Sequence, residues 1–103
     1  MINSLKKAVK IIVQIAHPEK IILFGSRARG NHTLHSDYDL IVLKKSLRKQ
    51  RALTQKIYLN FKNIGAPVDV IVTDLRKYQE LKNDPYQIYM EADKNGRVIY
   101  EKS

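Results

Sequence analysis

The segment whose residues are best suited to chemistry begins with a glycine-serine pair, and ten residues separate this pair from two closely spaced acids. The pair opens a turn that occupies residues 25–30 (GSRARG) and comes directly after the apolar run at 21–24 (IILF). Gly25 lets the backbone approach a phosphate closely because it has no Cβ. If a short helix begins near Ser26, its free N–H groups point at the same anion, and the Ser26 hydroxyl can add a donor. These residues therefore predict a phosphate-binding turn.

Two arginines, Arg27 and Arg29, put positive charge beside this turn. Guanidinium groups bind phosphate oxygens well, so both are candidates for phosphate contacts, although most arginines are simply exposed at a surface. We expect at most one of them to face the ligand. The histidines of the following loop, His32 and His35, are interpreted as surface residues rather than as metal ligands or a general base.

The two acids, Asp37 and Asp39, lie two residues apart in a predicted strand that runs from Asp37 to Leu43. Side chains at this spacing leave the same face of a strand, with Cβ atoms about 6–7 Å apart, which suits carboxylates that flank metal ions. Two unpaired carboxylates this close repel each other, and a divalent cation between them removes the repulsion. This segment therefore predicts a metal site.

A third acid, Asp69, lies among β-branched residues in a later predicted strand, residues 68–73. A charge is costly to bury without a partner, so this position is explained if Asp69 faces the same metal ions from an adjacent strand. Oxygen-only ligands favour Mg2+, with Mn2+ as the alternative. Three carboxylates beside a phosphate-binding turn indicate two-metal phosphoryl transfer, in which one ion activates a hydroxyl and the other stabilises the leaving oxygen.

The elements that must position these residues alternate between helix and strand. Helical patterns of apolar residues cover 2–16 and 47–61, and strands are predicted at 21–24, 37–43, 68–73 and, as an edge strand, 98–100. The order predicts one domain, residues 1–103. Its fold class is α/β or α+β, with a small mixed sheet of three to four strands packed with helices.

Two short helices are predicted in the second half of the chain from their capping signals. Thr73 or Asp74 caps the first, and Asp84-Pro85 starts the second, with Gln87 completing a capping box. Asn95-Gly96 predicts a left-handed end to that helix. The acids of this second helix, including Glu91, are expected on a solvated face.

The composition narrows the class of partner. The chain has 103 residues, 44% of them hydrophobic, and a net charge of +9. Such a charge attracts nucleic acid, triphosphates or an acidic protein face, although Lys-rich helices that are simply solvated explain it equally well. No apolar run is long enough to span a bilayer, residues 1–16 lack the marks of a signal peptide, and cysteine is absent. We therefore expect a cytoplasmic protein that does not bind membranes.

The spacing and context of these motifs resemble a known superfamily. A Gly-Ser pair, ten intervening residues and Asp-x-Asp are the signature of the polymerase-β-like nucleotidyltransferases, and the fuller pattern here looks like their minimal nucleotidyltransferase (MNT) branch. The resemblance implies that Gly25 and Ser26 hold the β- and γ-phosphates of ATP. It implies that Asp37 and Asp39 bind two Mg2+ ions, and that Asp69 binds the catalytic ion and helps to deprotonate the acceptor. AMP would move to a hydroxyl, and pyrophosphate would leave.

The same resemblance implies a protein partner. In the MNT branch the partner is often a small helical HEPN-type protein, a ribonuclease toxin, which the transferase neutralises as an antitoxin by adenylylating a tyrosine. A chain of 103 residues has little surface for a second substrate, so a partner must supply part of the site. Two alternatives stay open: a non-catalytic module that neutralises its partner by contact, and a nucleic-acid binder or RNA nucleotidyltransferase. Assembly as a homo-oligomer or a hetero-oligomer also stays open.

Overall fold

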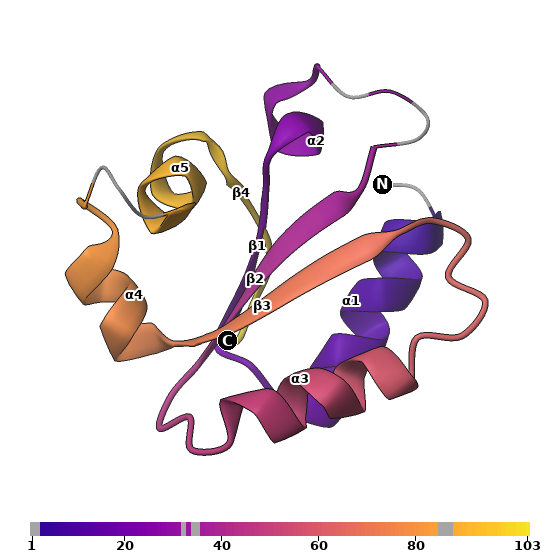
Figure 1. Cartoon of the computed structure of the whole chain (residues 1–103), viewed down its shortest axis with the longest axis horizontal. Coiled ribbons are helices and arrows are strands. Elements are labelled where there is room, and N and C mark those ends of the chain that lie inside the picture. Colours follow the sequence, from indigo (N-terminus) through magenta and orange to yellow (C-terminus); the bar gives the residue numbers. More distant parts are fainter. Residues whose placement is uncertain (1–2, 32, 34–35, 85–87) are drawn as a thin grey trace.

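The predicted alternation of helices and strands is present in the computed structural model, which describes residues 3–31, 33, 36–84 and 88–103. Within these residues the chain forms five helices and four strands (Figure 1). In chain order they are α1 (Asn3–Ala16), β1 (Lys20–Phe24), α2 (Ser26–Arg29), β2 (Tyr38–Lys44), α3 (Gln50–Leu59), β3 (Val68–Asp74), α4 (Leu75–Leu81), α5 (Ile88–Asn95) and β4 (Arg97–Glu101).

The four strands form one mixed sheet in the order β3-β2-β1-β4. β1 pairs antiparallel with β2 and with β4, whereas β2 and β3 are parallel. The parallel pair needs a crossover connection, which α3 supplies. The predicted α+β class, the mixed sheet and the final edge strand are therefore confirmed. No helix in the described part of the chain is long and apolar enough to cross a membrane.

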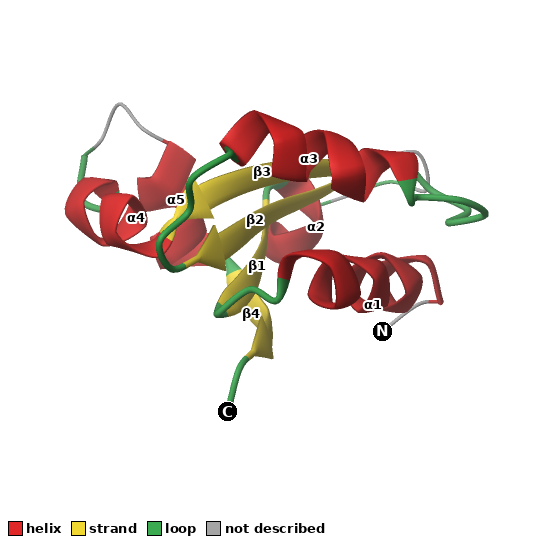
Figure 2. Ribbon diagram, turned by 90° about the horizontal axis from the view of Figure 1, so that it is seen from below, coloured by secondary structure: helices red, strands yellow, loops and turns green. Residues whose placement is uncertain are grey.

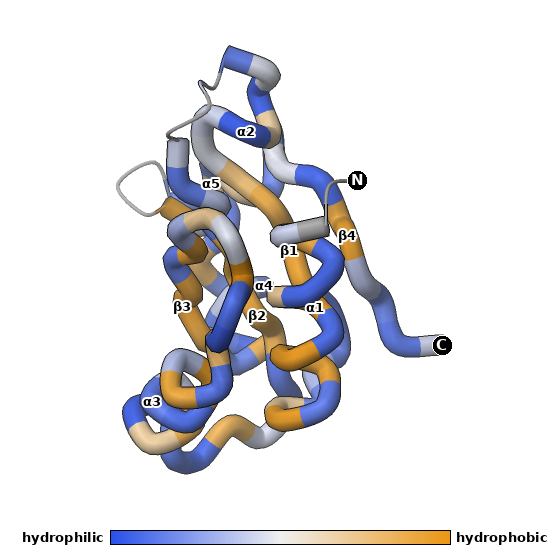
Figure 3. Tube along the Cα trace, turned by 90° about the vertical axis from the view of Figure 1, so that its right-hand side faces the viewer, coloured by the Kyte–Doolittle hydropathy of each residue, from blue (hydrophilic) through white to orange (hydrophobic). Residues whose placement is uncertain are grey.

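The two faces of the sheet bury separate cores, because successive strand residues point to opposite sides. Ile21 of β1 belongs to the larger core with Ile12 of α1 and Ile57 of α3, while its neighbour Ile22 belongs to a second core with Tyr78 of α4. In Figure 1 the sheet separates α1 and α3 from α4 and α5, and Figure 2 shows the same layers from a second direction. Figure 3 shows the apolar strand segments lying between these helices. The odd-numbered residues of β2 and β3 thus share the face that α4 and α5 partly cover.

Two helix ends differ from the predicted ones. α3 is shorter than the predicted 47–61 helix, because residues 45–49 form the turn that leaves β2. α5 begins at Ile88, and the predicted start signal at Pro85 and Gln87 lies outside the described residues. The predicted cap of α4 is confirmed at Asp74, whose carboxylate accepts a hydrogen bond from Arg76 N.

The predicted left-handed helix end at Asn95-Gly96 is wrong. Neither residue has a positive φ, and the left-handed glycines of the described chain are Gly25, Gly30 and Gly65. A Cβ at Gly96 would overlap the carbonyl oxygen of Ala92 and lie 2.7 Å from Cγ2 of Ile22. Glycine is needed at this position because the chain passes too close to α5 and β1 for any side chain.

Candidate active site

The glycine turn at the end of β1 has the strained backbone that its sequence suggests. Gly25 has φ 75° and ψ −157°, a region that is essentially open to glycine only, and its carbonyl accepts hydrogen bonds from Ala28 N and Arg29 N at 3.2 and 3.1 Å. α2 follows at once and ends at Gly30, which is left-handed with φ 83°. Gly25 therefore occupies the N-cap position, and Ser26 is the first helical residue rather than the cap.

Asp39 lies directly against this turn. Asp39 is the register partner of Phe24, the last residue of β1. A Cβ built on Gly25 would overlap Oδ2 of Asp39 and would lie 3.3 Å from its Cγ. The absence of a side chain at position 25 thus gives the carboxylate its place beside the glycine turn.

The register of the parallel pair places Asp69 beside Asp39. The two residues are direct partners of β2 and β3, so their side chains leave the same face of the sheet. Asp37 precedes β2 by one residue rather than opening it, and it still reaches this group. The charges of Asp69 and Asp37 act on Asp39, and Asp37 also acts on Asp69. The structure therefore brings the three predicted acids together.

Burial and the crowding of these carboxylates raise the pKa values of Asp39 and Asp69. Burial raises the pKa of Asp39 most, the charges of Asp69 and Asp37 raise it further, and Arg29 lowers it. The pKa of Asp69 is raised by partial desolvation, then by the hydrogen bond and the charge of Asp37. Asp69 is exposed, so water moderates the effect there. A cation between the carboxylates would relieve the repulsion that contributes to these raised pKa values.

The donor set fits a hard divalent cation. All three groups offer only oxygen, and their mutual repulsion is the kind that Mg2+ relieves. Within the described ranges, no three acidic, histidine or cysteine side chains are already gathered into a metal site. The charges of the three carboxylates act on one another, and Asp39 lies against Gly25, so the carboxylates are neighbours rather than a closed cage.

Arg27 contributes to the architecture of the turn. Its Nε and Nη2 donate to the carbonyl oxygen of Ser36 at 3.1 and 2.9 Å, and its guanidinium lies 4.0 Å from the centre of the Tyr38 ring. These contacts join α2 to the start of β2, where Asp37 and Asp39 lie. To bind a phosphate, as predicted, the Arg27 guanidinium would have to give up or share its contacts with Ser36 and Tyr38.

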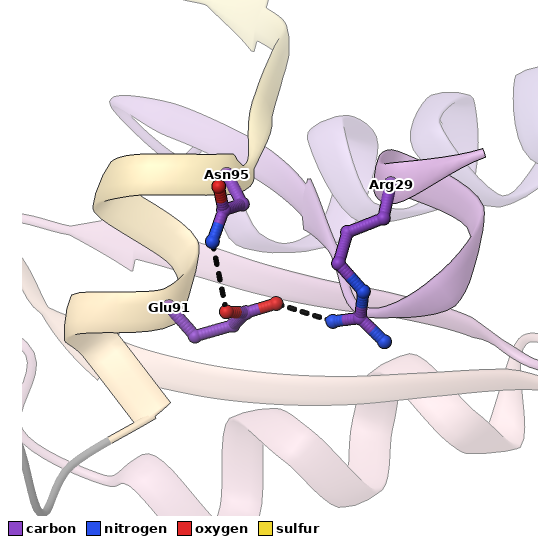
Figure 4. Close-up of polar contacts among 3 residues, drawn as sticks. All are labelled: Arg29, Glu91 and Asn95. Atoms are coloured by element: carbon purple, nitrogen blue, oxygen red, sulfur yellow. Dashed lines mark hydrogen bonds and ion pairs between the residues drawn. The ribbon is translucent and has the colours of Figure 1, made fainter. Parts of the chain in front are cut away.

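Arg29 lies closer to the acids and has a partner that the sequence did not suggest. It forms an ion pair with Glu91 of α5, and the second carboxylate oxygen of Glu91 accepts from Asn95 Nδ2 at 3.1 Å (Figure 4). The expectation that Glu91 lies on a purely solvated helix face is therefore wrong. Nothing local in the sequence signals this pair, because its members are 62 positions apart.

The acids lie on an open surface. Asp37 and Asp69 are exposed and Asp39 is half-buried. The most clearly formed concavities of the described residues, of about 160–420 Å³, are lined by other residues. His32 and His35 lie outside the described residues. A second molecule would have to cover this surface to enclose a substrate.

Fold and site together define a class: a mixed sheet whose neighbouring strands carry acids beside a glycine turn, as in polymerase-β-like nucleotidyltransferases. The match to a family model is nearly complete. Residues 6–103 match the family described as polymerase beta, nucleotidyltransferase, and the chain belongs to that family. The family resemblance of the motifs is thereby confirmed. Among curated proteins, none matches this sequence significantly.

Solved structures share the fold over the whole chain. A candidate nucleotidyltransferase from Sulfolobus solfataricus is 18% identical with a TM-score of 0.60, and the match covers 99% of this chain and 90% of that one. A toxin–antitoxin structure with AMP-PNP is 22% identical with a TM-score of 0.57, over 99% and 76% of the two chains. A variant of the MntA–HpeT toxin–antitoxin is 25% identical with a TM-score of 0.54, over 100% and 76%.

Proposed function

We propose that this chain transfers AMP from ATP to a hydroxyl of a partner protein, and that it does so with Mg2+. The observation that carries the proposal is the meeting of Asp37, Asp39 and Asp69 on one face of the sheet beside the Gly25 turn. Family membership makes nucleotidyl transfer the chemistry to expect of such a site. The AMP-PNP of one structural neighbour supports an adenine nucleotide as the donor.

The residues divide the work by position. Gly25 and Ser26 would bind the β- and γ-phosphates through backbone N–H groups and the serine hydroxyl. Asp37, Asp39 and Asp69 would hold Mg2+, which supplies charge neutralisation for the triphosphate and activation of the acceptor hydroxyl. Of the two arginines, we propose Arg29 for a phosphate contact, because its charge acts on Asp39 although it also pairs with Glu91. Arg27 is instead held by Ser36 and Tyr38.

The chemical step follows from the exposed position of Asp69. This carboxylate would accept the proton of the acceptor hydroxyl while the hydroxyl oxygen attacks the α-phosphorus. The bond from the α-phosphorus to the oxygen that bridges it to the β-phosphate then breaks, and pyrophosphate leaves. A raised pKa suits a general base, because it brings proton affinity closer to neutrality.

The partner we propose is a HEPN-type toxin, which this chain would neutralise as an antitoxin in the cytoplasm by modifying a tyrosine. The toxin–antitoxin complexes among the structural neighbours support this class of partner. The open surface around the acids supports a partner that completes the site. A single folded toxin could then supply both the acceptor hydroxyl and the surface that encloses the open site.

The test is transfer of AMP from ATP to a purified HEPN-type toxin, read by intact-mass measurement. Asp69→Asn should reduce the transfer rate by on the order of 10²–10⁴-fold while ATP stays bound. Glu80→Gln is the matched control, because Glu80 is an exposed acid of α4 that pairs only loosely with Arg76. Undiminished transfer by Asp69→Asn would refute the assigned role. Neutralisation that persists in Asp39→Ala without any modified toxin would favour a non-catalytic binding module.

A further inference from the structure

The positive charge of the chain is concentrated on one segment. Of the 19 cations, seven lie in residues 44–62, which contain no acid, whereas the rest of the chain has twelve cations against ten acids. The seven are Lys44, Lys45, Arg48, Lys49, Arg51, Lys56 and Lys62. None of them forms an ion pair with a described residue. Residues 44–62 run from the last residue of β2 through α3 to the residues just after it. They therefore carry most of the net charge of +9.

Several of these cations lie at the unfavourable end of a helix. Lys49 is the N-cap of α3 without a side-chain cap bond, Arg51 lies in the first turn, and no acid is present there. The N-terminus of a helix carries partial positive charge, so cations at this position cost stability and acids are normally preferred. No acid of the first turn of α3 offsets these cations, and such an unfavourable arrangement is typical of a surface that binds a ligand.

An apolar hollow of about 420 Å³ lies among these charges. Its floor is aliphatic and consists of Leu47, Ala52 and Leu53. Four of the seven cations line it: Lys44, Arg48, Lys49 and Lys56. We call this feature the basic hollow. A purely solvated face would not need an apolar floor, so charge and shape together indicate an amphipathic ligand.

The basic hollow is held in place by the sheet. Leu47 N donates to Oδ1 of Asp74 at 3.0 Å, and Gln50 Nε2 donates to the carbonyl oxygen of Val72 at 2.6 Å. Asp74, an acid at the border of the hollow, is thus engaged by backbone amides, including its own helix cap. The docking surface is formed without a partner, which limits the ordering that binding would cost.

The basic hollow is remote from the three acids. Asp39 and Lys44 are both in β2, five residues apart, which corresponds to about 17 Å along the strand. The candidate active site therefore does not account for the hollow. A ligand bound there would leave the acids free.

We propose that the basic hollow docks an acidic segment of a partner protein, with an aliphatic side chain of that segment in the hollow and its carboxylates on the surrounding cations. Nucleic acid fits less well. Phosphates would satisfy the cations, but no aromatic side chain lines the hollow for a base to stack on. The next aromatic rings along the chain, Tyr58 of α3 and Phe61 just after it, pack edge to face against each other, and the Tyr58 hydroxyl oxygen accepts a hydrogen bond from Val70 N of the sheet. The proposal is independent of the catalytic activity.

The experiment uses the full chain labelled with 15N and a designed helical peptide of Glu and Leu as the probe. Amide shifts should change over residues 44–56 and should leave residues 25–39 and 69 unchanged. Arg48→Glu with Lys49→Glu should weaken peptide binding by at least 10-fold. This double variant should still fold, because acids are favoured at a helix N-terminus. Lys6→Glu with Lys10→Glu is the matched control: it reverses two exposed cations of α1 and should retain binding.

The outcomes separate the proposal from plain electrostatics. A peptide with each Leu replaced by Ser should bind at least 10-fold more weakly, because it cannot fill the apolar floor. Equal weakening by the two double variants, or equal binding of both peptides, would overturn the proposal. So would an RNA 20-mer that binds at residues 44–56 while the acidic peptide does not.

Discussion

Gly25 controls the position of the carboxylate on which the proposed chemistry depends. Its φ of 75° is unfavourable for any other residue, and its missing Cβ leaves the space that Oδ2 of Asp39 occupies. Gly30 closes the same short helix with a similar φ of 83°, but no atom lies within 4 Å of a Cβ built there. Both glycines thus have a positive φ, but only Gly25 lies against the acid.

Replacing each glycine by alanine separates these effects. Gly30→Ala should lose roughly 1–2 kcal/mol of folding free energy, because alanine resists a left-handed backbone. Gly25→Ala should lose more, because the φ and ψ of Gly25 are essentially open to glycine only. Gly25→Ala should in addition displace Asp39 and reduce AMP transfer by on the order of 10²-fold. Thermal unfolding and transfer kinetics of the two variants, side by side, provide the measurement. Comparable transfer rates in both would show that the contact with Asp39 is unimportant.

At the scale of elements, α5 stabilises the glycine turn from outside. The ion pair of Glu91 with Arg29 connects α5 to α2, and Asn95 orients the Glu91 carboxylate one helical turn along (Figure 4). The hydrogen bond from Asn95 lowers the pKa of Glu91 most, followed by the hydrogen bond and charge of Arg29. A lowered carboxyl pKa stabilises the fold at pH values above the ordinary value of 4.5.

Glu91→Gln should lower the melting temperature by a few degrees at pH 7, because Arg29 loses its charged partner. The difference from the unmodified chain should disappear as the pH falls below 4.5 and through the lowered pKa of Glu91, since the glutamate is then protonated. Glu80→Gln removes an exposed pair of 3.9 Å within α4 and should change little at either pH. A Glu91→Gln deficit that persists unchanged at pH 3 would argue against the ion pair as its cause.

At the scale of the whole molecule, two opposite charge patterns occupy different regions of a +9 chain. The three acids crowd together at one end of β2, and the unpaired cations gather beyond its other end. The raised pKa values of Asp39 and Asp69 mean that the folded state holds protons more tightly than the unfolded state. Their contribution therefore favours folding at low pH and is lost as the pH rises through the raised pKa values.

Mg2+ should replace this lost stabilisation near neutral pH. Saturation at about 100 times the dissociation constant corresponds to about 2.7 kcal/mol, which raises the melting temperature of a chain of this size by on the order of 10 °C. The gain should fall as the pH is lowered through the raised pKa values of Asp39 and Asp69, where these carboxyl groups take up protons, and it should be smaller in Asp69→Asn, which keeps only two of the three carboxylates. Differential scanning calorimetry with Mg2+ and with chelator measures it. An equal Mg2+ effect in Asp69→Asn would place the ion elsewhere.

Local patterns in the sequence predicted the element order, the glycine turn and the acids, because residues close in the chain express the periods of helix and strand directly. They did not predict the partners of Arg29 and Arg27. They also misread Gly96, whose requirement comes from the approach of Ile22 and Ala92 rather than from a left-handed backbone. The β-branched neighbours of Asp69 also suggested that this side chain is buried, but it is exposed while Val68 and Val70 face the core.

By itself, then, the sequence determined which residues could do chemistry and on which kinds of element they lie. Only the tertiary structure decided that Asp39 and Asp69 are register partners, that Glu91 reaches Arg29, and that an apolar hollow lies among the cations of residues 44–56. The physical reason is that local periodicity acts within a few residues. Strand register and helix packing instead depend on how distant segments bury their apolar faces together.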